Sequence, residues 1–150
     1  MIRLFNNVGH SPAWPLVITA IKALEEEGIG FQPFVAPVYN DSALVSFGDN
    51  GHVEGFLIYR YDDVKCSWFI LLAYVLPEHR RKGIHTALFS ALVERAKKRG
   101  DILSIDCGTH IDNRAAQAAF EAQGRVKTAI MYSYSLRDWV DGKDPLEIEK

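Results

Sequence analysis

A short basic segment with one glycine is the part of this sequence best suited to do chemistry. An apolar, strand-like run stops at Pro77, and Arg80-Arg81-Lys82-Gly83 then leads into a helical pattern of apolar residues. The first backbone N–H groups of a helix are unpaired and lie at the positive end of its dipole, and glycine lets a ligand approach the backbone closely. The segment therefore predicts a site for a phosphate or pyrophosphate group. A solvated basic helix start is the alternative interpretation.

The elements that must position this segment alternate between strand and helix. Helices are predicted from Ser11-Pro12 to Gly28, over 84–99 and from Asp112-Asn113 to Gly124, and strands over 43–47, 53–61, 65–76, 102–107 and 126–136. Turn residues at 49–51 and 62–63 join consecutive strands as hairpins. This order predicts an α/β fold with a mixed central sheet flanked by helices.

Length and composition bound the class of protein. The chain has 150 residues, 48% of them hydrophobic, so we expect one domain over 1–150 with a weakly patterned, flexible tail from about residue 137 that includes a helical turn near 138–140. The formal net charge of -2 argues against nucleic-acid binding, although 79–82 and 97–99 are basic. The longest apolar run, Trp68–Leu76, is far shorter than the roughly 20 residues of a membrane-spanning helix.

The N-terminal residues indicate the cellular location of the protein, and the location in turn indicates the redox state of its two cysteines. The first residues lack the features of a secretion signal, so the cytoplasm is the expected location. In that reducing compartment Cys66 and Cys107 are expected to be free, buried thiols. Together with His79, His85 and His110 they show none of the paired spacings of a metal site, so no metal is expected.

Two ordered motifs resemble those of the GNAT superfamily of N-acetyltransferases. The family's acetyl-CoA motif, R/Q-x-x-G-x-G/A after a strand, matches Arg80–Ile84, and Val75, Pro77 and Leu88 fit the wider frame. His85 stands where Gly or Ala is usual, so its side chain either turns away from the pyrophosphate or adds a donor to it. Downstream, Asn113-Arg114-Ala115-Ala116, Phe120 and Gly124 resemble N-x-x-A-x-x-x-Y/F-x-x-x-G.

The resemblance spans roughly 53–136 and implies a GNAT-type fold with acetyl-CoA as co-substrate. Asn113 would hydrogen-bond the pantetheine arm and Phe120 would pack against it, although a helix cap and a core aromatic explain them equally well. The residues that the resemblance assigns to acetyl-CoA are Leu76, Arg80, Arg81, Lys82, Gly83, Ile84, His85, Thr86, Asn113 and Phe120.

Acetyl transfer from a thioester to an amine needs a base, an oxyanion donor and a proton for the leaving thiolate. In the family the strand before the loop splays from its neighbour, so the backbone of 73–76 would face the thioester, with the Val75 amide as oxyanion donor. The family's usual Tyr and Glu are Phe120 and Gly108 here. His110 is the predicted base, because a pKa of about 6.5 suits proton removal at neutral pH.

Other side chains remain open as proton carriers. Glu54 acting through water and Asp106 are alternative bases, and Tyr132 or Tyr134 is the candidate acid if the strand over 126–136 turns it toward the thioester. Water alone is a further alternative.

The predicted function is transfer of an acetyl group to a primary amine of a small molecule or a protein. Polyamine-like and aminoglycoside-like compounds, protein termini or lysines, and aminoacyl-tRNA are all admissible acceptors, and acidic residues at 25–27 and 62–63 would attract a cationic amine. The alternative is a non-catalytic, GNAT-like module that binds acyl-CoA or a partner. Family resemblance also suggests a homodimer.

Overall fold

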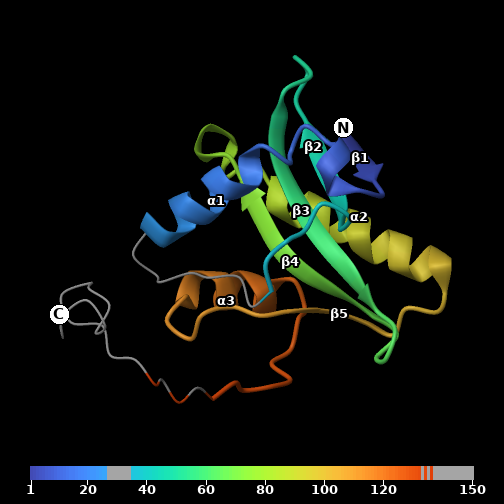
Figure 1. Ribbon diagram of the computed structural model, residues 1–150, viewed down its shortest axis with the longest axis vertical. Coiled ribbons are helices and arrows are strands. Elements are labelled where there is room, and N and C mark those ends of the chain that lie inside the picture. Colours follow the sequence, from blue (N-terminus) through green and yellow to red (C-terminus); the bar gives the residue numbers. More distant parts are fainter. Residues whose placement is uncertain (27–34, 133, 135, 137–150) are drawn as a thin grey trace.

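Five strands form one sheet in the order β1-β2-β3-β4-β5 in the computed structural model, which describes residues 1–26, 35–132, 134 and 136 (Figure 1). The strands are β1 (Ile2–Phe5), β2 (Ser42–Phe47), β3 (Val53–Asp62), β4 (Ser67–Val75) and β5 (Ser104–Cys107). The first four pair antiparallel, and β5 is parallel to β4. The predicted mixed sheet with hairpin-joined first strands is therefore confirmed.

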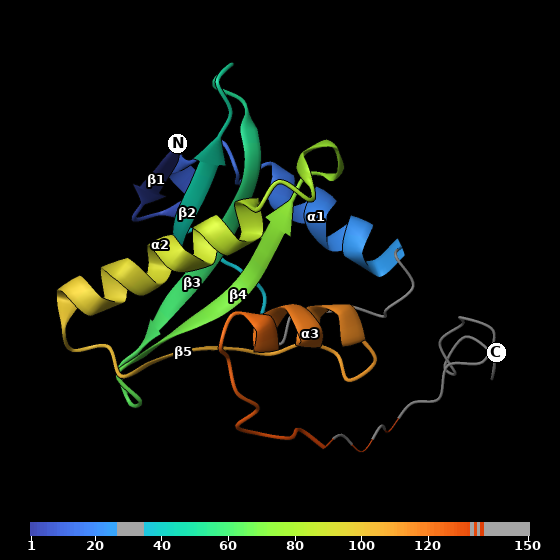
Figure 2. The ribbon, with the colours of Figure 1, turned by 180° about the vertical axis from the view of Figure 1, so that it is seen from behind.

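The helices cover both faces of this sheet. α1 (Leu16–Leu24) lies on the face toward the viewer in Figure 1, and α2 (Ile84–Arg99) crosses the opposite face in Figure 2. α3 (Arg114–Ala122) follows β5, and short 3-10 turns, η1 (Val8–His10) and η3 (Pro77–His79), precede α1 and α2. Parallel strands cannot be joined by a tight turn, so α2 provides the crossover from β4 to β5.

Alternation along the central strands divides the core into two layers. On β3, Phe56 and Ile58 pack on the α1 side, whereas Leu57 and Tyr59 pack on the α2 side. α2 buries the predicted apolar stripe there, through Leu88, Leu92 and Ala96. Among the described residues, no helix is long and apolar enough to cross a membrane.

Three local predictions are wrong. The first helix begins at Leu16 rather than at Ser11-Pro12, because the Ser11 hydroxyl donates to Val8 O (2.8 Å) and accepts from Ala13 N (3.2 Å), closing a turn instead. Cys66 lies in a turn with a positive φ of 51°, outside the strand, and both cysteines are free but only half-buried.

The predicted strand over 126–136 is the third. None of its described residues belongs to a strand, and Val126, Ile130 and Tyr132 are 80%, 77% and 89% exposed. A strand needs a partner ladder, and the four-residue β5 pairs only with β4 among the described residues. The tail predicted from residue 137, with its helical turn at 138–140, lies outside the described residues.

Candidate functional site

The open edge of β4 is the first component of the site. Pairing between β4 and β5 runs from Ser67↔Ser104 to Ile70↔Cys107, after which β4 continues and the strands diverge (Figure 2). The Leu76 N–H donates to Glu54 O on β3 (2.9 Å). Neighbouring residues of a strand point their backbone groups in opposite directions, so the Val75 N–H faces the side that β5 has left.

The loop after β4 is the second component. Arg81 and Gly83 both have left-handed backbones, with φ of 63° and 78°. Gly83 is the N-cap of α2 and has no side chain with which to cap it, and the Ala87 N–H donates to Gly83 O (2.9 Å). The N–H groups of 84–86 therefore lack intrahelical partners, and such consecutive N–H groups form a concavity that favours anions.

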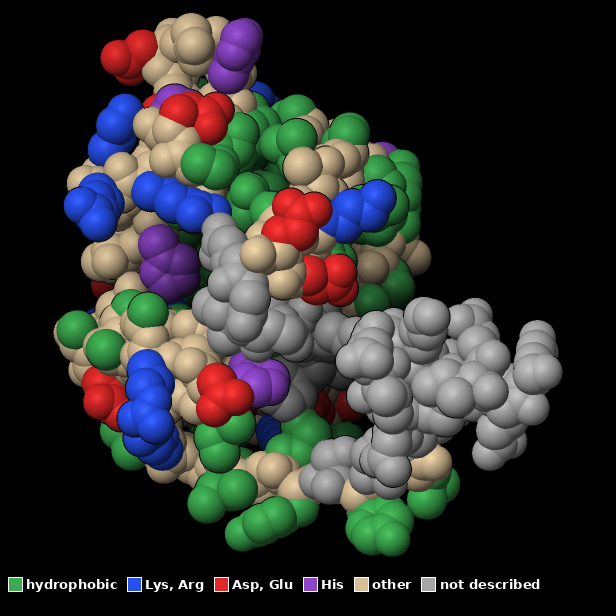
Figure 3. All heavy atoms as spheres, turned by 90° about the vertical axis from the view of Figure 1, so that its left-hand side faces the viewer, with side chains coloured by type: hydrophobic (Ala, Val, Ile, Leu, Met, Phe, Trp, Pro, Cys, Tyr) green, Lys and Arg blue, Asp and Glu red, His purple; other side chains and the backbone are tan. Residues whose placement is uncertain are grey.

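Cationic side chains surround this concavity. Arg80 folds back so that its Nε donates to Val75 O (3.1 Å) and its guanidinium lies 5.5 Å from the Tyr74 ring centroid. Arg81 and Lys82 are exposed. The face of the molecule on which the loop lies has Lys and Arg side chains gathered above a histidine (Figure 3). The positive charge predicted for this segment is thus concentrated at the start of α2.

Glu54 lies between Ser46 on β2 and His79 in the loop after β4. One of its carboxylate oxygens accepts from Ser46 Oγ (3.4 Å), and the other lies 3.8 Å from His79 Nδ1 on η3. That ring nitrogen is buried and has no hydrogen-bond partner among the described residues. The sequence offered no sign of the His79 contact, because it joins residues 25 positions apart.

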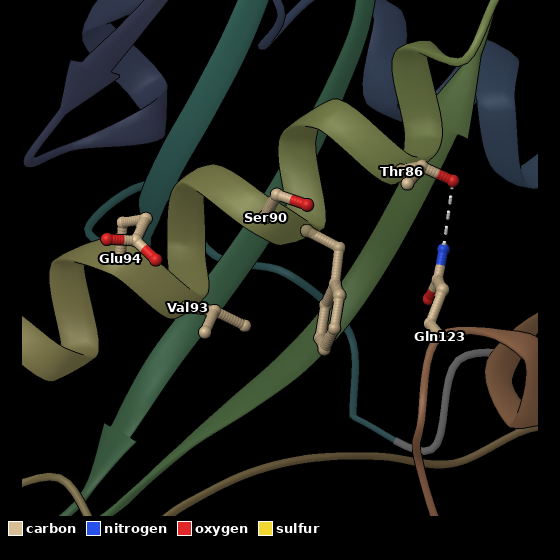
Figure 4. A pocket seen from close by; sticks show the side chains of 6 residues that line it. Thr86, Ser90, Val93, Glu94 and Gln123 are labelled. Atoms are coloured by element: carbon tan, nitrogen blue, oxygen red, sulfur yellow. Dashed lines mark hydrogen bonds between the residues drawn. The ribbon is translucent and has the colours of Figure 1, made fainter.

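His85 turns away from the loop and toward α3. Its ring stacks on Phe120 with centroids 6.4 Å apart, and its Nδ1 lies 3.3 Å from Gln123 Nε2, which also donates to Thr86 Oγ1 (3.3 Å; Figure 4). Burial, and then the charge of Arg125, lower the pKa of His85 below its ordinary value. The His85 ring therefore packs against α3 and the residue that ends it.

Arg125 is a site residue that sequence reasoning missed. Its guanidinium lies between the rings of Phe89 (3.7 Å) and Phe120 (4.4 Å), and its Nη1 donates to Cys107 Sγ (3.3 Å). It therefore joins α2, α3 and β5. Burial lowers the pKa of Arg125 and raises that of Cys107. Arg125 Nε and Nη2 are buried without a hydrogen-bond partner among the described residues.

A groove of about 240 Å³ lies between α2 and the end of α3. Figure 4 shows Thr86, Ser90 and Glu94 along one side of α2, with Gln123 facing Thr86. Gln123 Oε1 is another buried acceptor with no partner among the described residues. The unpartnered polar atom in this groove therefore lies on its α3 side.

The other predicted catalytic side chains are spread around the opening. His110 stands in the β5–α3 connection, where its Nδ1 accepts from Asp112 N (3.1 Å). Asn113 caps α3 by accepting from Ala116 N (3.1 Å), and Asp106 accepts from Ser104 Oγ (3.0 Å). Tyr132 is 89% exposed in the segment that lacks the predicted strand, so the structure does not bring it to the site.

Comparisons with known proteins agree with this geometry. Residues 16–124 match the acetyltransferase (GNAT) family, whereas a search of curated proteins finds no match. A CoA complex of the aminoglycoside N-acetyltransferase AAC(6')-Iy is 21% identical, with a TM-score of 0.63, over 92% of this chain and 100% of that one. Ribosomal-protein-alanine N-acetyltransferase from Brucella melitensis biovar Abortus 2308 is 22% identical, with a TM-score of 0.62, over 92% and 99%. At these identities the two structures show the same fold. The described residues contain no group of three potential metal ligands.

The burial of His85 predicts a pH-dependent stability. Below about pH 6.5 the unfolded chain protonates this imidazole while the folded protein resists it, so the free energy of unfolding should fall as the pH drops from 6.5 toward the lower folded pKa. His85→Phe keeps an aromatic ring against Phe120 and should flatten this dependence in urea unfolding measured from pH 7.5 to 5.5. His52→Asn, at an exposed hairpin position, is the control and should keep the wild-type slope. Equal slopes in wild type and His85→Phe would contradict this account.

Proposed function

The chain belongs to the acetyltransferase (GNAT) family, and we propose that it binds acetyl-CoA across the start of α2 and the open edge of β4 and transfers the acetyl group to a primary amine. One observation supports this most strongly. The Val75 N–H on the open edge of β4 and the N–H groups of 84–86 at the start of α2 follow one another along the chain, joined by one short cationic loop. A ligand with a phosphate at one end and an amide-containing arm at the other matches that order.

Each part of acetyl-CoA then has a matching group. The pyrophosphate binds the N–H groups of 84–86, with Arg80–Lys82 around it, and the pantetheine arm runs along the β4 edge from Leu76 toward α3. Asn113 and Phe120 border the arm on the α3 side, and the buried N–H groups of Arg125 are donors for its carbonyl oxygens. The orphaned donors and the glycine backbone both fit this ligand.

The chemistry requires attack of a neutral amine on the thioester carbonyl and cleavage of the C–S bond. The Val75 N–H stabilises the negative charge on the carbonyl oxygen, since it faces the opening between the strands. His110 removes the amine proton through Nδ1, the ring nitrogen that carries the lone pair, and this nitrogen exchanges its contact with Asp112 N (3.1 Å) for the amine proton. Glu54 is engaged by Ser46 and His79, which favours a role in anchoring the loop over proton removal.

The leaving thiolate also needs a proton donor. Phe120 occupies the position of the family's usual tyrosine and has no proton to give, so water or Tyr132 supplies it, the latter only if 126–132 closes over the site. The acceptor is proposed only as an amine. The two similar enzymes act on an aminoglycoside and on a ribosomal-protein alanine, and an N-acetyl group is the chemistry that their names share.

Gly83→Glu tests the anion site. A carboxylate next to the helix N-terminus should repel the pyrophosphate, so we expect acetyl-CoA affinity in calorimetric titration to fall at least tenfold. Gly83→Ala is the matched control, because a Cβ there meets no atom within 4 Å but strains a backbone with φ of 78°. It should cost about 1 kcal/mol of stability and weaken binding far less. Tight binding by Gly83→Glu would exclude this loop as the phosphate site.

His110→Ala tests the proposed base. Turnover, followed as thiol release with an amine acceptor, should fall about 10²-fold while acetyl-CoA affinity changes less than twofold, because the imidazole acts on the amine. Asp112→Asn keeps the backbone N–H that contacts His110 but removes the carboxylate that lies 3.7 Å from His110 Nδ1, so it should lower turnover less than His110→Ala does. Unchanged turnover in His110→Ala would remove this residue from the mechanism. Acetyl-CoA binding without turnover of any amine would instead favour the non-catalytic module.

We further propose that the chain forms a homodimer through the segment after α3 and the edge of β5, which pairs with no second strand among the described residues. Apolar side chains of this segment are exposed, among them Ile130 (77%) and Met131 (67%). Such a surface favours burial against a partner. Wild type should sediment as a dimer at micromolar concentration, and Ile130→Asp should shift it to monomer. Val64→Asp, at an equally exposed site in the β3–β4 turn (89%), should remain dimeric. A monomeric wild type would overturn this proposal.

A further inference from the structure

A second pocket, of about 360 Å³, lies at the opposite end of the sheet from Val75 and Gly83. There β1 and β3 end, β2 and β4 begin, and the last turns of α2 lie over the sheet (Figure 2). The lining residues are Leu4, Asn6, Ser42, Tyr59, Tyr61, Trp68, Arg95, Lys98 and Arg99. A helix of 16 residues spans about 24 Å, so this pocket is separate from the acetyl-CoA loop at the start of α2.

Three cations of α2 share this pocket. Arg95, Lys98 and Arg99 are spaced at i, i+3 and i+4, which places them on one side of the helix, and none of the described lining residues is acidic. Lys97 is on the same turn but does not line the pocket, and it pairs with Glu94 (3.8 Å). Basic residues favour a helix C-terminus generally. That preference does not explain why the three gather at one concavity.

The position of Arg99 is fixed before any ligand arrives. Its Nε contacts Asp101 Oδ1 (2.9 Å), and its guanidinium lies 4.9 Å from the Tyr61 ring centroid. Asp101 offsets one of the three positive charges. The pocket therefore retains a net charge of about +2, the charge that complements a dianion.

The floor of the pocket is polar at one point. The Tyr59 and Trp68 rings pack against each other at 4.9 Å and are buried, which leaves no free ring face for stacking. Tyr59 is paired with Ser42 across β3 and β2, and the Ser42 Oγ donates its proton to Asn6 O (3.3 Å). Burial raises the pKa of Tyr59, against the opposing charges of Arg95 and Arg99, so its hydroxyl stays protonated at neutral pH. The donors left for a ligand are therefore the N–H groups of Arg95, Lys98 and Arg99.

We propose that this pocket binds a phosphate group, as inorganic phosphate or a small phosphate monoester, separately from acetyl-CoA. The positive charge, the size of the cavity and the N–H donors of Arg95, Lys98 and Arg99 all match such a ligand. Among the described lining residues, Tyr61 has the one ring that is exposed (40%), and the Arg99 guanidinium lies over it, which disfavours stacking of a nucleobase. The binding energy therefore comes from the phosphate itself.

The test uses the full chain carrying Gly83→Glu, because this variant should prevent anions from binding at the loop before α2. Inorganic phosphate and glycerol 3-phosphate are titrated at constant ionic strength and followed by NMR, using the Trp68 indole N–H and the backbone amides of Tyr59 and Tyr61. Both should shift these resonances with a saturable millimolar dissociation constant, whereas uncharged glycerol should not.

Matched variants decide whether the pocket is responsible. Arg95→Gln and Lys98→Gln should each weaken phosphate binding at least fivefold, whereas Lys97→Gln, which removes the same charge outside the pocket, should change it less than twofold. All three positions are exposed, so the variants should fold normally. Equal effects of the three variants, or an absence of saturable shifts at Trp68, would overturn the proposal.

Tighter binding of a single-stranded oligonucleotide through the same residues, without saturable phosphate binding, would assign the surface to nucleic acid instead. Acetyl-CoA binding by the Gly83 loop is tested independently, so the two proposals can fail separately.

Discussion

The end of the β4–β5 ladder at Ile70↔Cys107 is the constraint on which the rest of the site depends. A parallel pair requires a long crossover, and here α2 supplies it, so the start of α2 must follow directly after the free part of β4. The backbone from 72 to 75 then has one side paired with β3 and one side open. Backbone groups left without a partner favour a ligand that can hydrogen-bond with them.

The two ends of α2 differ in how their charged side chains interact with the helix dipole. Cations in the last turn agree with the helix dipole and stabilise the helix, whereas Arg80–Lys82 precede the positive end of the dipole and oppose it. Folding alone does not favour that second arrangement. The left-handed backbone of Arg81 adds strain at the same place. An anion at this loop would relieve the charge repulsion, which is why the loop is better explained by a ligand than by stability.

Local sequence features predicted the β2–β3 and β3–β4 hairpins, the α2 stripe and the glycine loop, because each depends on residues close together in the chain. Contacts between distant segments could not be predicted in this way. Arg125 reaches Cys107 and two aromatic rings from three different elements, and nothing in its neighbouring residues indicates that. The strand predicted over 126–136 is wrong for the same reason. Alternating apolar residues indicate which side chains of a strand would be buried, but a strand also needs a partner strand to pair with, and the local sequence does not show one. The Ser11 error was different: a hydroxyl that caps a helix also closes a turn.

The environment of Phe120 explains why this chain lacks the family's usual tyrosine. Its ring stacks on His85 at 6.4 Å, and the Arg125 guanidinium lies 4.4 Å from its centroid. The interaction of the Arg125 cation with the ring face is favourable and holds α2, α3 and β5 together. It requires an aromatic ring at position 120 but no hydroxyl group. His85, kept neutral by burial, adds no second positive charge to this stack. The position of the family's usual tyrosine therefore serves packing here, and Phe120 itself has no proton to transfer.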